Sequence, residues 1–177
     1  MNIPNRLTFI RLILAYIGFT AMMLDHWVTT FFLILTSVLL DAVDGKVARH
    51  LMQVSKSGIF LDVMVDKVVI ISTFLLIGYK FDPRFFYLGL LMILREYTMD
   101  TMRSIAASQQ KIISADFFSK LKGVILMIAM VGAIGNRAFF RNIQLELAMV
   151  SIGAVGMTLS YMTLGRFYLK YKALLIS

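Results

Sequence analysis

The chain has 177 residues, of which 59% are hydrophobic and only 16% are charged, and its mean hydropathy is +0.81. A soluble domain carries about a quarter charged residues, so this composition excludes an ordinary soluble protein and indicates an integral membrane protein. The net charge of +8 does not indicate a nucleic-acid partner, because the chain has no basic soluble segment and membrane proteins gather Lys and Arg in cytoplasmic loops.

Apolar stretches close to the ~20 residues that span a bilayer recur along the whole chain. The first of them has no clear cleavage site after it, so we expect an uncleaved span rather than a signal peptide. Turns are predicted at Asp82-Pro83 and Gly135-Asn136. No linker divides the chain, so we expect one domain over residues 1–177. The fold class is therefore all-α, with six transmembrane helices predicted over residues 8–24, 27–50, 57–79, 84–107, 116–135 and 145–169.

Basic residues gather at one set of helix ends, and this bias predicts the orientation in the membrane. The richer ends carry Arg6, Arg11, Lys46, Arg49, Lys56, Arg103, Lys111, Lys120, Lys122, Arg166, Lys170 and Lys172. The opposite ends carry Lys80, Arg84, Arg137 and Arg141. Both termini and the 46–57 connection are therefore expected on the cytoplasmic side of the cell's inner (cytoplasmic) membrane.

Four aspartates lie close together in the stretch DAVDGKVARHLMQVSKSGIFLDVMVD. Asp41 and Asp44 are three residues apart on one predicted helix, and Asp62 and Asp66 are four apart on the next, so each pair shares a helix face. The short loop between the helices predicts antiparallel packing with the acidic faces opposed. Carboxylates held so close repel one another, and a hard cation such as Mg²⁺, Mn²⁺ or Ca²⁺ removes that repulsion.

Two other interpretations of the aspartates compete with a metal site. They could form structural ion pairs, for which Lys46, Arg49 and Lys67 are available as partners. They could also belong to a carrier of protons or metal ions. Such a carrier needs polar steps across the whole membrane, whereas the later part of the third span, VVIISTFLLIGY, offers only hydroxyls.

The spacing of the acidic stretch, D-x2-D-G-x2-A-R-x8-G-x3-D-x3-D, resembles the signature of the CDP-alcohol phosphotransferase family without a departure. The resemblance implies a six-helix membrane enzyme, commonly a homodimer embedded among membrane lipids, with a site that faces the cytoplasm. It implies that CDP-diacylglycerol and two divalent cations, Mg²⁺ or Mn²⁺, bind there, and that the phosphatidyl group passes to an alcohol with release of CMP.

By position, the resemblance also implies roles for individual residues. The metal ligands would be Asp41, Asp44, Asp62 and Asp66, and Asp66 would also be the general base. The nucleotide site would be lined by Gly45, Ala48, Arg49 and Gly58. The opening NIPNRLTFIR is similar to the start of the phosphatidylglycerophosphate synthases of this family, which implies that Asn5, Thr8 and Arg11 contact the CDP moiety.

The later part of the chain bears on the acceptor alcohol. The R-E-x6-R spacing in the fourth span, two lysines near the fifth and a Tyr-x4-Arg in the sixth are similar to those synthases. They imply an acceptor phosphate site formed by Arg95, Arg103, Lys120, Lys122 and Arg166, with Glu96 paired to a neighbouring basic group. The implied acceptor is sn-glycerol 3-phosphate, and the product phosphatidylglycerol phosphate.

The segment SKLKGVIL departs from the synthase pattern. It has Ser119, Gly123 and Leu126 where the synthases carry Gly, Thr and Gln. The loss of the Thr and Gln removes two polar groups near the expected acceptor site. A family member that uses inositol phosphate, serine or another alcohol is therefore the alternative within the same family.

Overall fold

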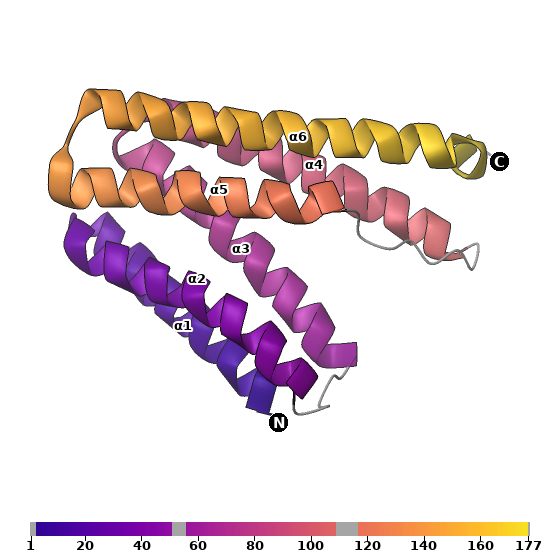
Figure 1. Cartoon of the computed structure of the whole chain (residues 1–177), viewed down its shortest axis with the longest axis horizontal. Coiled ribbons are helices and arrows are strands. Elements are labelled where there is room, and N and C mark those ends of the chain that lie inside the picture. Colours follow the sequence, from indigo (N-terminus) through magenta and orange to yellow (C-terminus); the bar gives the residue numbers. More distant parts are fainter. Residues whose placement is uncertain (1–2, 51–55, 109–116, 177) are drawn as a thin grey trace.

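Figure 1 shows the computed structural model of the chain, which describes residues 3–50, 56–108 and 117–176. These residues form six α-helices and one π-helical turn, and no strand occurs among them. The elements are α1 (Ile3–Met23), α2 (Trp27–His50), α3 (Lys56–Lys80), α4 (Pro83–Ser108), α5 (Phe117–Gly135), η1 (Asn136–Phe140) and α6 (Ile143–Ile176). The predicted all-α fold with six helices is confirmed.

The helix bounds differ from the prediction mainly at the two chain ends. Helix α1 begins at Ile3 rather than at residue 8, and α6 ends at Ile176 rather than at residue 169. The prediction followed the apolar runs, which stop where Arg6, Lys170 and Lys172 appear. Arg and Lys are good helix formers, so both helices continue past the apolar segments.

The connection between α5 and α6 lies later in the chain than the turn predicted at Gly135-Asn136. Gly135 has helical angles (φ −62°, ψ −40°), and the helix continues through η1 until Arg141 takes a left-handed conformation with φ 51°. The Asn136 side-chain amide donates to the Asn142 carbonyl (3.0 Å), and the Asn142 amide donates back to Asn136 Oδ1 (3.0 Å). The Gly-Asn pair therefore does not form the turn, because Asn136 instead holds the chain reversal six residues further on.

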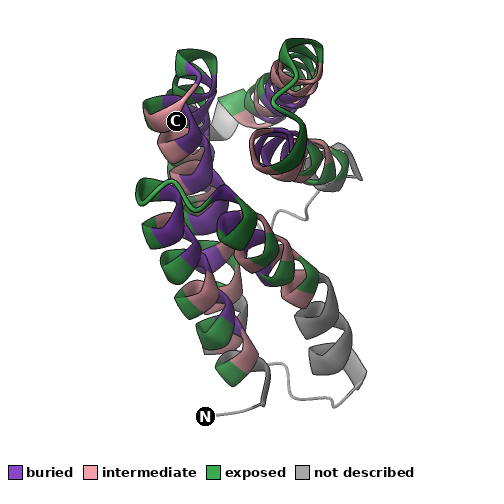
Figure 2. Ribbon diagram, turned by 90° about the vertical axis from the view of Figure 1, so that its left-hand side faces the viewer, coloured by how far each residue is buried: buried purple, intermediate pink, exposed green. Residues whose placement is uncertain are grey.

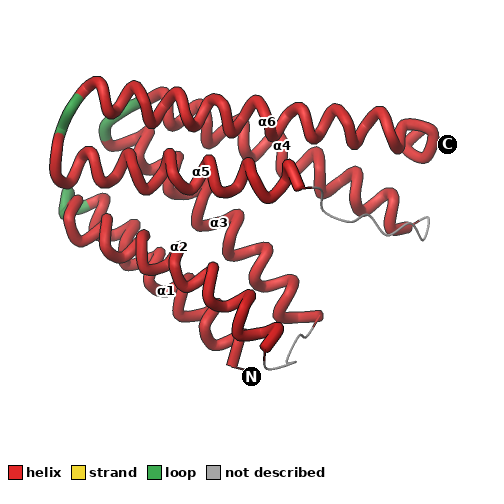
Figure 3. The backbone as a smooth tube through the Cα atoms, in the orientation of Figure 1, coloured by secondary structure: helices red, strands yellow, loops and turns green. Residues whose placement is uncertain are grey.

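The helices fall into two groups, α1–α2–α3 and α4–α5–α6, which diverge towards the side where both termini lie (Figure 1). The described loops, residues 24–26, 81–82 and 141–142, gather at the opposite end, where the two groups come together (Figure 3). This up-and-down course places the end of α2 and the start of α3 beside each other. It also places the end of α4, the start of α5 and the end of α6 on the same side of the molecule.

The core lies where the two groups meet. Ile34 on α2, Phe74 and Ile77 on α3, Phe85 on α4 and Met130 on α5 are completely buried, and the rings of Phe74 and Phe85 are 5.9 Å apart. Buried residues face the inside of the bundle, and exposed residues cover its outside (Figure 2). The exposed residues include many large apolar side chains, such as Phe32, Phe60, Tyr97 and Leu169. An apolar outer surface of this kind is typical of contact with lipid or another protein.

Among the residues that the structure describes, three segments are long and apolar enough to cross a membrane: Arg6–Met23, Leu121–Phe140 and Ile143–Lys172. A shorter apolar segment covers Trp27–Asp41 of α2. Helices α3 and α4 carry several charged residues, among them Asp62, Asp66 and Lys67 on α3. The chain is thus an all-α membrane protein, whereas crossing by all six helices stays a prediction.

Candidate active site

One face of α1 packs against α2 and α3 and contains a buried arginine side chain. Thr8, Arg11, Ala15, Gly18 and Met22 recur every three or four residues, and all five are buried. This is the spacing of one helix face. Arg11 is only 1% exposed, although its neighbours on this face are apolar or small. A charge placed there needs partners from the helices that cover it.

The partners of Arg11 are three of the predicted site aspartates. Nη1 of Arg11 contacts Oδ1 of Asp41 on α2 and donates a 2.9 Å hydrogen bond to Oδ1 of Asp62 on α3. Nη2 donates to Oδ1 of Asp66 on α3 at 3.1 Å. The structure therefore brings Asp41, Asp62 and Asp66 together around one guanidinium, and this contact ties α1, α2 and α3 to each other.

The other residues predicted to bind the metal ions or the nucleotide belong to the same three helices as this group. Thr8 is buried on α1, three residues before Arg11, and Gly58 is half-buried in the first turn of α3. The remaining five belong to α1 or to the last turns of α2, and their side chains lie outside the described part of the structure: Asn5, Asp44, Gly45, Ala48 and Arg49.

The structure contradicts one suggested ion-pair partner and supplies another. Lys67 follows Asp66 on α3, but its Nζ donates to Oδ2 of Asp100 on α4 at 2.5 Å and does not turn back to the aspartates. The cation that meets the aspartates is Arg11, for which the sequence suggested a CDP contact. Its spacing from Thr8, Ala15 and Gly18 on one small-residue face was the signal that α1 buries it.

The carboxylate group suits a hard cation. Its donors are oxygens only, and one guanidinium stands against three carboxylates, so negative charge is in excess. The side chains of Asp41, Asp62 and Asp66 are 24%, 44% and 38% exposed, whereas that of Arg11 is 2% exposed, so the carboxylates reach the surface of the helix bundle while the guanidinium lies inside it. The described carboxylates do not by themselves form a cluster of metal ligands, and the guanidinium lies among them.

A second charged group lies between α3, α4 and α5, centred on Glu96. Oε1 of Glu96 accepts from Nη1 of Arg95 (2.5 Å) and from Nζ of Lys122 on α5 (3.0 Å). Its Oε2 lies 3.4 Å from Nζ of Lys67. Glu96 therefore meets three cations, whereas the sequence predicts pairing with one neighbouring basic group. Lys67 was not among the predicted site residues, because its contact with α4 depends on packing between distant segments.

Arg95 and Lys122 also bind α6. Nε of Arg95 donates to the Ser160 carbonyl at 3.3 Å, and its Nη2 donates to Oγ1 of Thr163 at 3.1 Å. Nζ of Lys122 donates to Oγ of Ser160 at 3.4 Å. Arg95 is 2% exposed, so its donors are directed to the protein itself, and this contact fixes α6 against α4.

The other residues predicted to bind the acceptor lie on the same helices, α4, α5 and α6. Arg103 lies on α4, two turns after Arg95, and is half-buried. Arg166 is exposed on α6, and Tyr161 on the same helix donates to the Leu91 carbonyl at 3.1 Å. Lys120 belongs to α5, but its side chain lies outside the described residues. The structure thus joins Arg95 and Lys122 in one group and places Arg103 and Arg166 on the helices that carry it.

The fold and these two charged groups define a helical membrane protein with polar centres inside its bundle. Residues 1–166 match the family model described as CDP-alcohol phosphatidyltransferase. The chain belongs to the CDP-alcohol phosphatidyltransferase family, and it is a transferase. The resemblance noted in the acidic stretch is confirmed by this match over most of the chain.

Curated relatives add information on the acceptor. The chain is 29% identical over 145 residues to a CDP-diacylglycerol–glycerol-3-phosphate 3-phosphatidyltransferase of Wigglesworthia glossinidia brevipalpis, covering 78% of this chain and 80% of the relative. It is 35% identical over 101 residues to a protein of the same description from Mycoplasma genitalium, covering 56% and 42%. It is also 34% identical over 109 residues to a CDP-diacylglycerol–inositol 3-phosphatidyltransferase of Saccharomyces cerevisiae, covering 60% and 49%.

Proposed function

We propose that the protein transfers the phosphatidyl group from CDP-diacylglycerol to sn-glycerol 3-phosphate, forming phosphatidylglycerol phosphate and CMP. The observation that carries the proposal is the convergence of Asp41, Asp62 and Asp66, from two helices, on one buried cation. This arrangement gathers negative oxygens at one accessible place, as a site for metal-bound pyrophosphate requires. The family match supports the transfer itself.

In the proposed reaction Asp66 is the general base. The acceptor hydroxyl oxygen attacks the phosphorus that carries the diacylglycerol, and its proton passes to the Asp66 carboxylate. The bond between this phosphorus and the bridging oxygen breaks, and CMP leaves with the electron pair. Asp66 lies on α3 in the same carboxylate group as Asp41 and Asp62, so the base is next to the residues proposed to hold the metal ions.

Asp41, Asp44, Asp62 and Asp66 are proposed to hold the two divalent cations, Mg²⁺ or Mn²⁺. When bound, these ions offset the negative charge of the pyrophosphate and of the leaving CMP. The donor chemistry supports this role, because three of the four carboxylates already lie around one positive charge. The nucleotide is proposed to bind to Asn5, Thr8, Gly45, Ala48, Arg49 and Gly58.

The acceptor assignment rests on the cations of the second half of the chain. The phosphate of glycerol 3-phosphate is proposed to be attracted and oriented by Arg95, Arg103, Lys120, Lys122 and Arg166. Within this set, the contacts favour a positioning role for Arg95, which is buried and bonded to Glu96, Ser160 and Thr163. The names of several relatives support glycerol 3-phosphate, whereas two relatives named for inositol support the alternative acceptor.

CMP release from CDP-diacylglycerol by the purified protein tests the acceptor. The assay contains Mg²⁺ or Mn²⁺ and one alcohol at a time: glycerol 3-phosphate, inositol, inositol phosphate or serine. Glycerol 3-phosphate is expected to give the highest kcat/KM, and Arg166→Gln to raise the KM for glycerol 3-phosphate without changing that for CDP-diacylglycerol. Faster CMP release with any of the other alcohols would replace the proposed acceptor while leaving the phosphatidyl transfer intact.

The proposal includes a membrane arrangement. All six helices would cross the inner membrane as one domain, with both termini and the carboxylate group on the cytoplasmic side, where Lys and Arg are in excess. The homodimer implied by the family resemblance is part of the same proposal.

A further inference from the structure

Arg11 holds an unusual place for a charged residue, because it is buried on α1 and contacts three aspartates from other helices. We propose that Arg11 and a divalent cation compete for these carboxylates, so that metal binding drives the guanidinium away from Asp41, Asp62 and Asp66. The inference rests on the proposed function, since it takes these aspartates to be the metal ligands.

The contact made by Nη1 is the first support for competition. This single nitrogen contacts Oδ1 of Asp41 on α2 and Oδ1 of Asp62 on α3. It thereby bridges the two helices that would share a metal ion. An ion that binds these carboxylates needs their oxygens at about 2.0–2.6 Å, and a guanidinium on the same oxygens would stand within contact range of the ion. Two cations so close repel strongly.

The surroundings of Arg11 are the second support. Its Nε is buried and has no hydrogen-bond partner among the described residues. A buried donor without a partner carries a desolvation cost, so the paired position is not fully favourable for the guanidinium. The carboxylates are considerably more exposed than Arg11, so an ion can reach them from solvent while the guanidinium still contacts them.

Removal of the Arg11 charge distinguishes competition with a metal ion from a purely structural ion pair. Without a metal ion, Arg11 reduces the repulsion among three carboxylates, so its removal destabilises the protein in either case. Only competition predicts a second effect, a tighter metal complex once the guanidinium is gone. The two effects have opposite signs, and they can be measured on the same variant.

The test compares wild-type protein with Arg11→Met after chelator treatment, in the same detergent. Mn²⁺ affinity is measured by titration calorimetry in the absence of nucleotide, and thermal unfolding is followed with and without Mn²⁺. Arg11→Met is expected to bind Mn²⁺ about tenfold more tightly or better. Its melting temperature is expected to fall below that of the wild type in chelator and to recover when Mn²⁺ is added.

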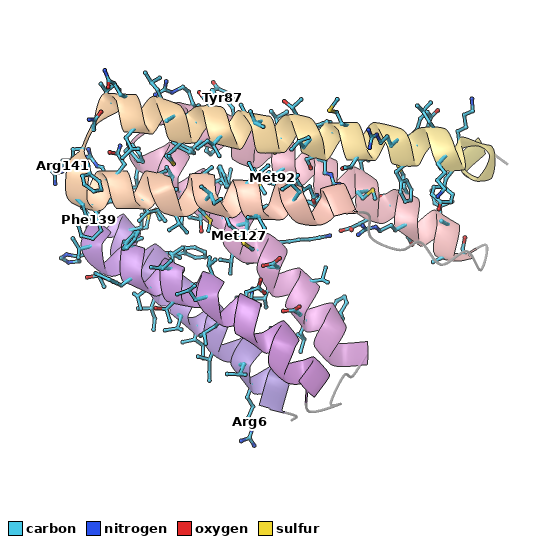
Figure 4. All side chains as sticks on the ribbon, in the orientation of Figure 1. Arg6, Tyr87, Met92, Met127, Phe139 and Arg141 are labelled. Atoms are coloured by element: carbon cyan, nitrogen blue, oxygen red, sulfur yellow. The ribbon has the colours of Figure 1, made fainter. Side chains whose placement is uncertain are left out.

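Arg6→Met is the matched control, because it removes the same charge from the same helix. Arg6 is exposed, and its side chain points away from the helix bundle (Figure 4). Mn²⁺ affinity is expected to stay within about twofold of the wild type. A gain equal to that of Arg11→Met would show that general charge on α1, rather than the Arg11 contacts, governs the affinity, and would overturn the proposal.

Arg11→Lys keeps the test valid if Arg11→Met does not fold. An ammonium is a compact point charge that lacks the planar fork of Arg, so it can contact fewer of the three carboxylates at once. It is expected to bind Mn²⁺ severalfold more tightly than the wild type. Unchanged or weaker Mn²⁺ binding in both Arg11 variants would overturn the competition.

A failure of the proposed function gives a different result. Wild-type protein that does not bind Mn²⁺, or binds it equally well after Asp62→Asn, would show that the aspartates are not metal ligands. The proposed metal site and the competition would then both be wrong. Binding that depends on Asp62 but not on Arg11 would overturn the competition alone.

Discussion

Two charged groups in the described part of the chain each contain a buried arginine, and each group draws its members from three or more helices. Arg11 meets Asp41, Asp62 and Asp66, and Glu96 meets cations of α3, α4 and α5. A buried ion pair does not by itself guarantee stability. The loss of one partner, however, leaves an uncompensated charge and is strongly destabilising. These groups therefore specify which helices must lie side by side.

Glu96→Gln is expected to lower the free energy of unfolding by about 3 kcal/mol. The amide would leave Arg95 and Lys122 without the carboxylate that now compensates them, whereas Lys67 would keep its ion pair with Asp100. Thermal or denaturant unfolding in a fixed detergent measures the effect. The control is Glu146→Gln, because its partner Arg84 (3.2 Å) is exposed and also pairs with Asp82 (2.9 Å), so no cation loses its only carboxylate and the cost should be less than about 1 kcal/mol. Equal losses in the two variants would contradict a special role for Glu96.

At the level of elements, the close packing of α3 against α4 depends on a glycine. A Cβ added at Gly78 would lie 2.2 Å from the backbone nitrogen of Phe86 on α4. A backbone atom cannot move aside as the end of a flexible side chain can, so α3 and α4 approach this closely only because residue 78 has no side chain.

Gly78→Ala is therefore expected to destabilise the protein by about 1–3 kcal/mol. Gly165→Ala on α6 is the matched control, since a Cβ there would meet nothing within 4 Å. Alanine favours helix over glycine, so the control should be neutral or slightly stabilising. A melting temperature for Gly78→Ala equal to that of the wild type would show that α3 and α4 do not pack as described.

The helices could be predicted from the sequence because they follow apolar runs and the Asp82-Pro83 break, which are local signals. The turn at Gly135-Asn136 was predicted wrongly, because Asn136 stays helical and its side chain bonds to Asn142, six residues later, where the chain reverses. Arg11 and Asp66 are 55 residues apart in the chain, and no local pattern records such a contact. For the same reason Lys67 is an available partner for the aspartates by sequence, although in the structure it pairs with Asp100 on α4.

At the scale of the whole molecule, the proposed topology places the two ends of the bundle on opposite sides of the membrane. The chain has no cysteine, so a single introduced thiol reports its own position. Ser108 ends α4 on the side of the termini, and Gln144 lies in the first turn of α6 at the opposite end; both residues are exposed.

In intact cells, a membrane-impermeant thiol reagent is expected to label Gln144→Cys but not Ser108→Cys. Permeabilised cells should give labelling of both variants, which controls for the reactivity of each thiol. Labelling of Ser108→Cys alone in intact cells would invert the topology. Labelling of both would show that the two ends of the bundle do not lie across a membrane from each other.

The carboxylate group on α2 and α3 is proposed to carry out phosphatidyl transfer, with Asp66 as the base. The most direct test is CMP release from CDP-diacylglycerol by Asp66→Asn with glycerol 3-phosphate as acceptor. Asp25→Asn is the control, because Asp25 lies in the turn after α1 at the other end, where a hydrogen bond from Lys80 (2.9 Å) lowers the pKa of Asp25. Each substitution thus replaces one carboxylate by an amide of the same size.

Asp66→Asn is expected to reduce kcat by about 10³-fold or more, since an amide cannot accept the hydroxyl proton and general-base catalysis contributes about 10²–10⁴. Binding of CDP-diacylglycerol in the presence of Mn²⁺ should be largely retained, and Asp25→Asn should keep the wild-type rate. Substantial CMP release by Asp66→Asn would contradict the account.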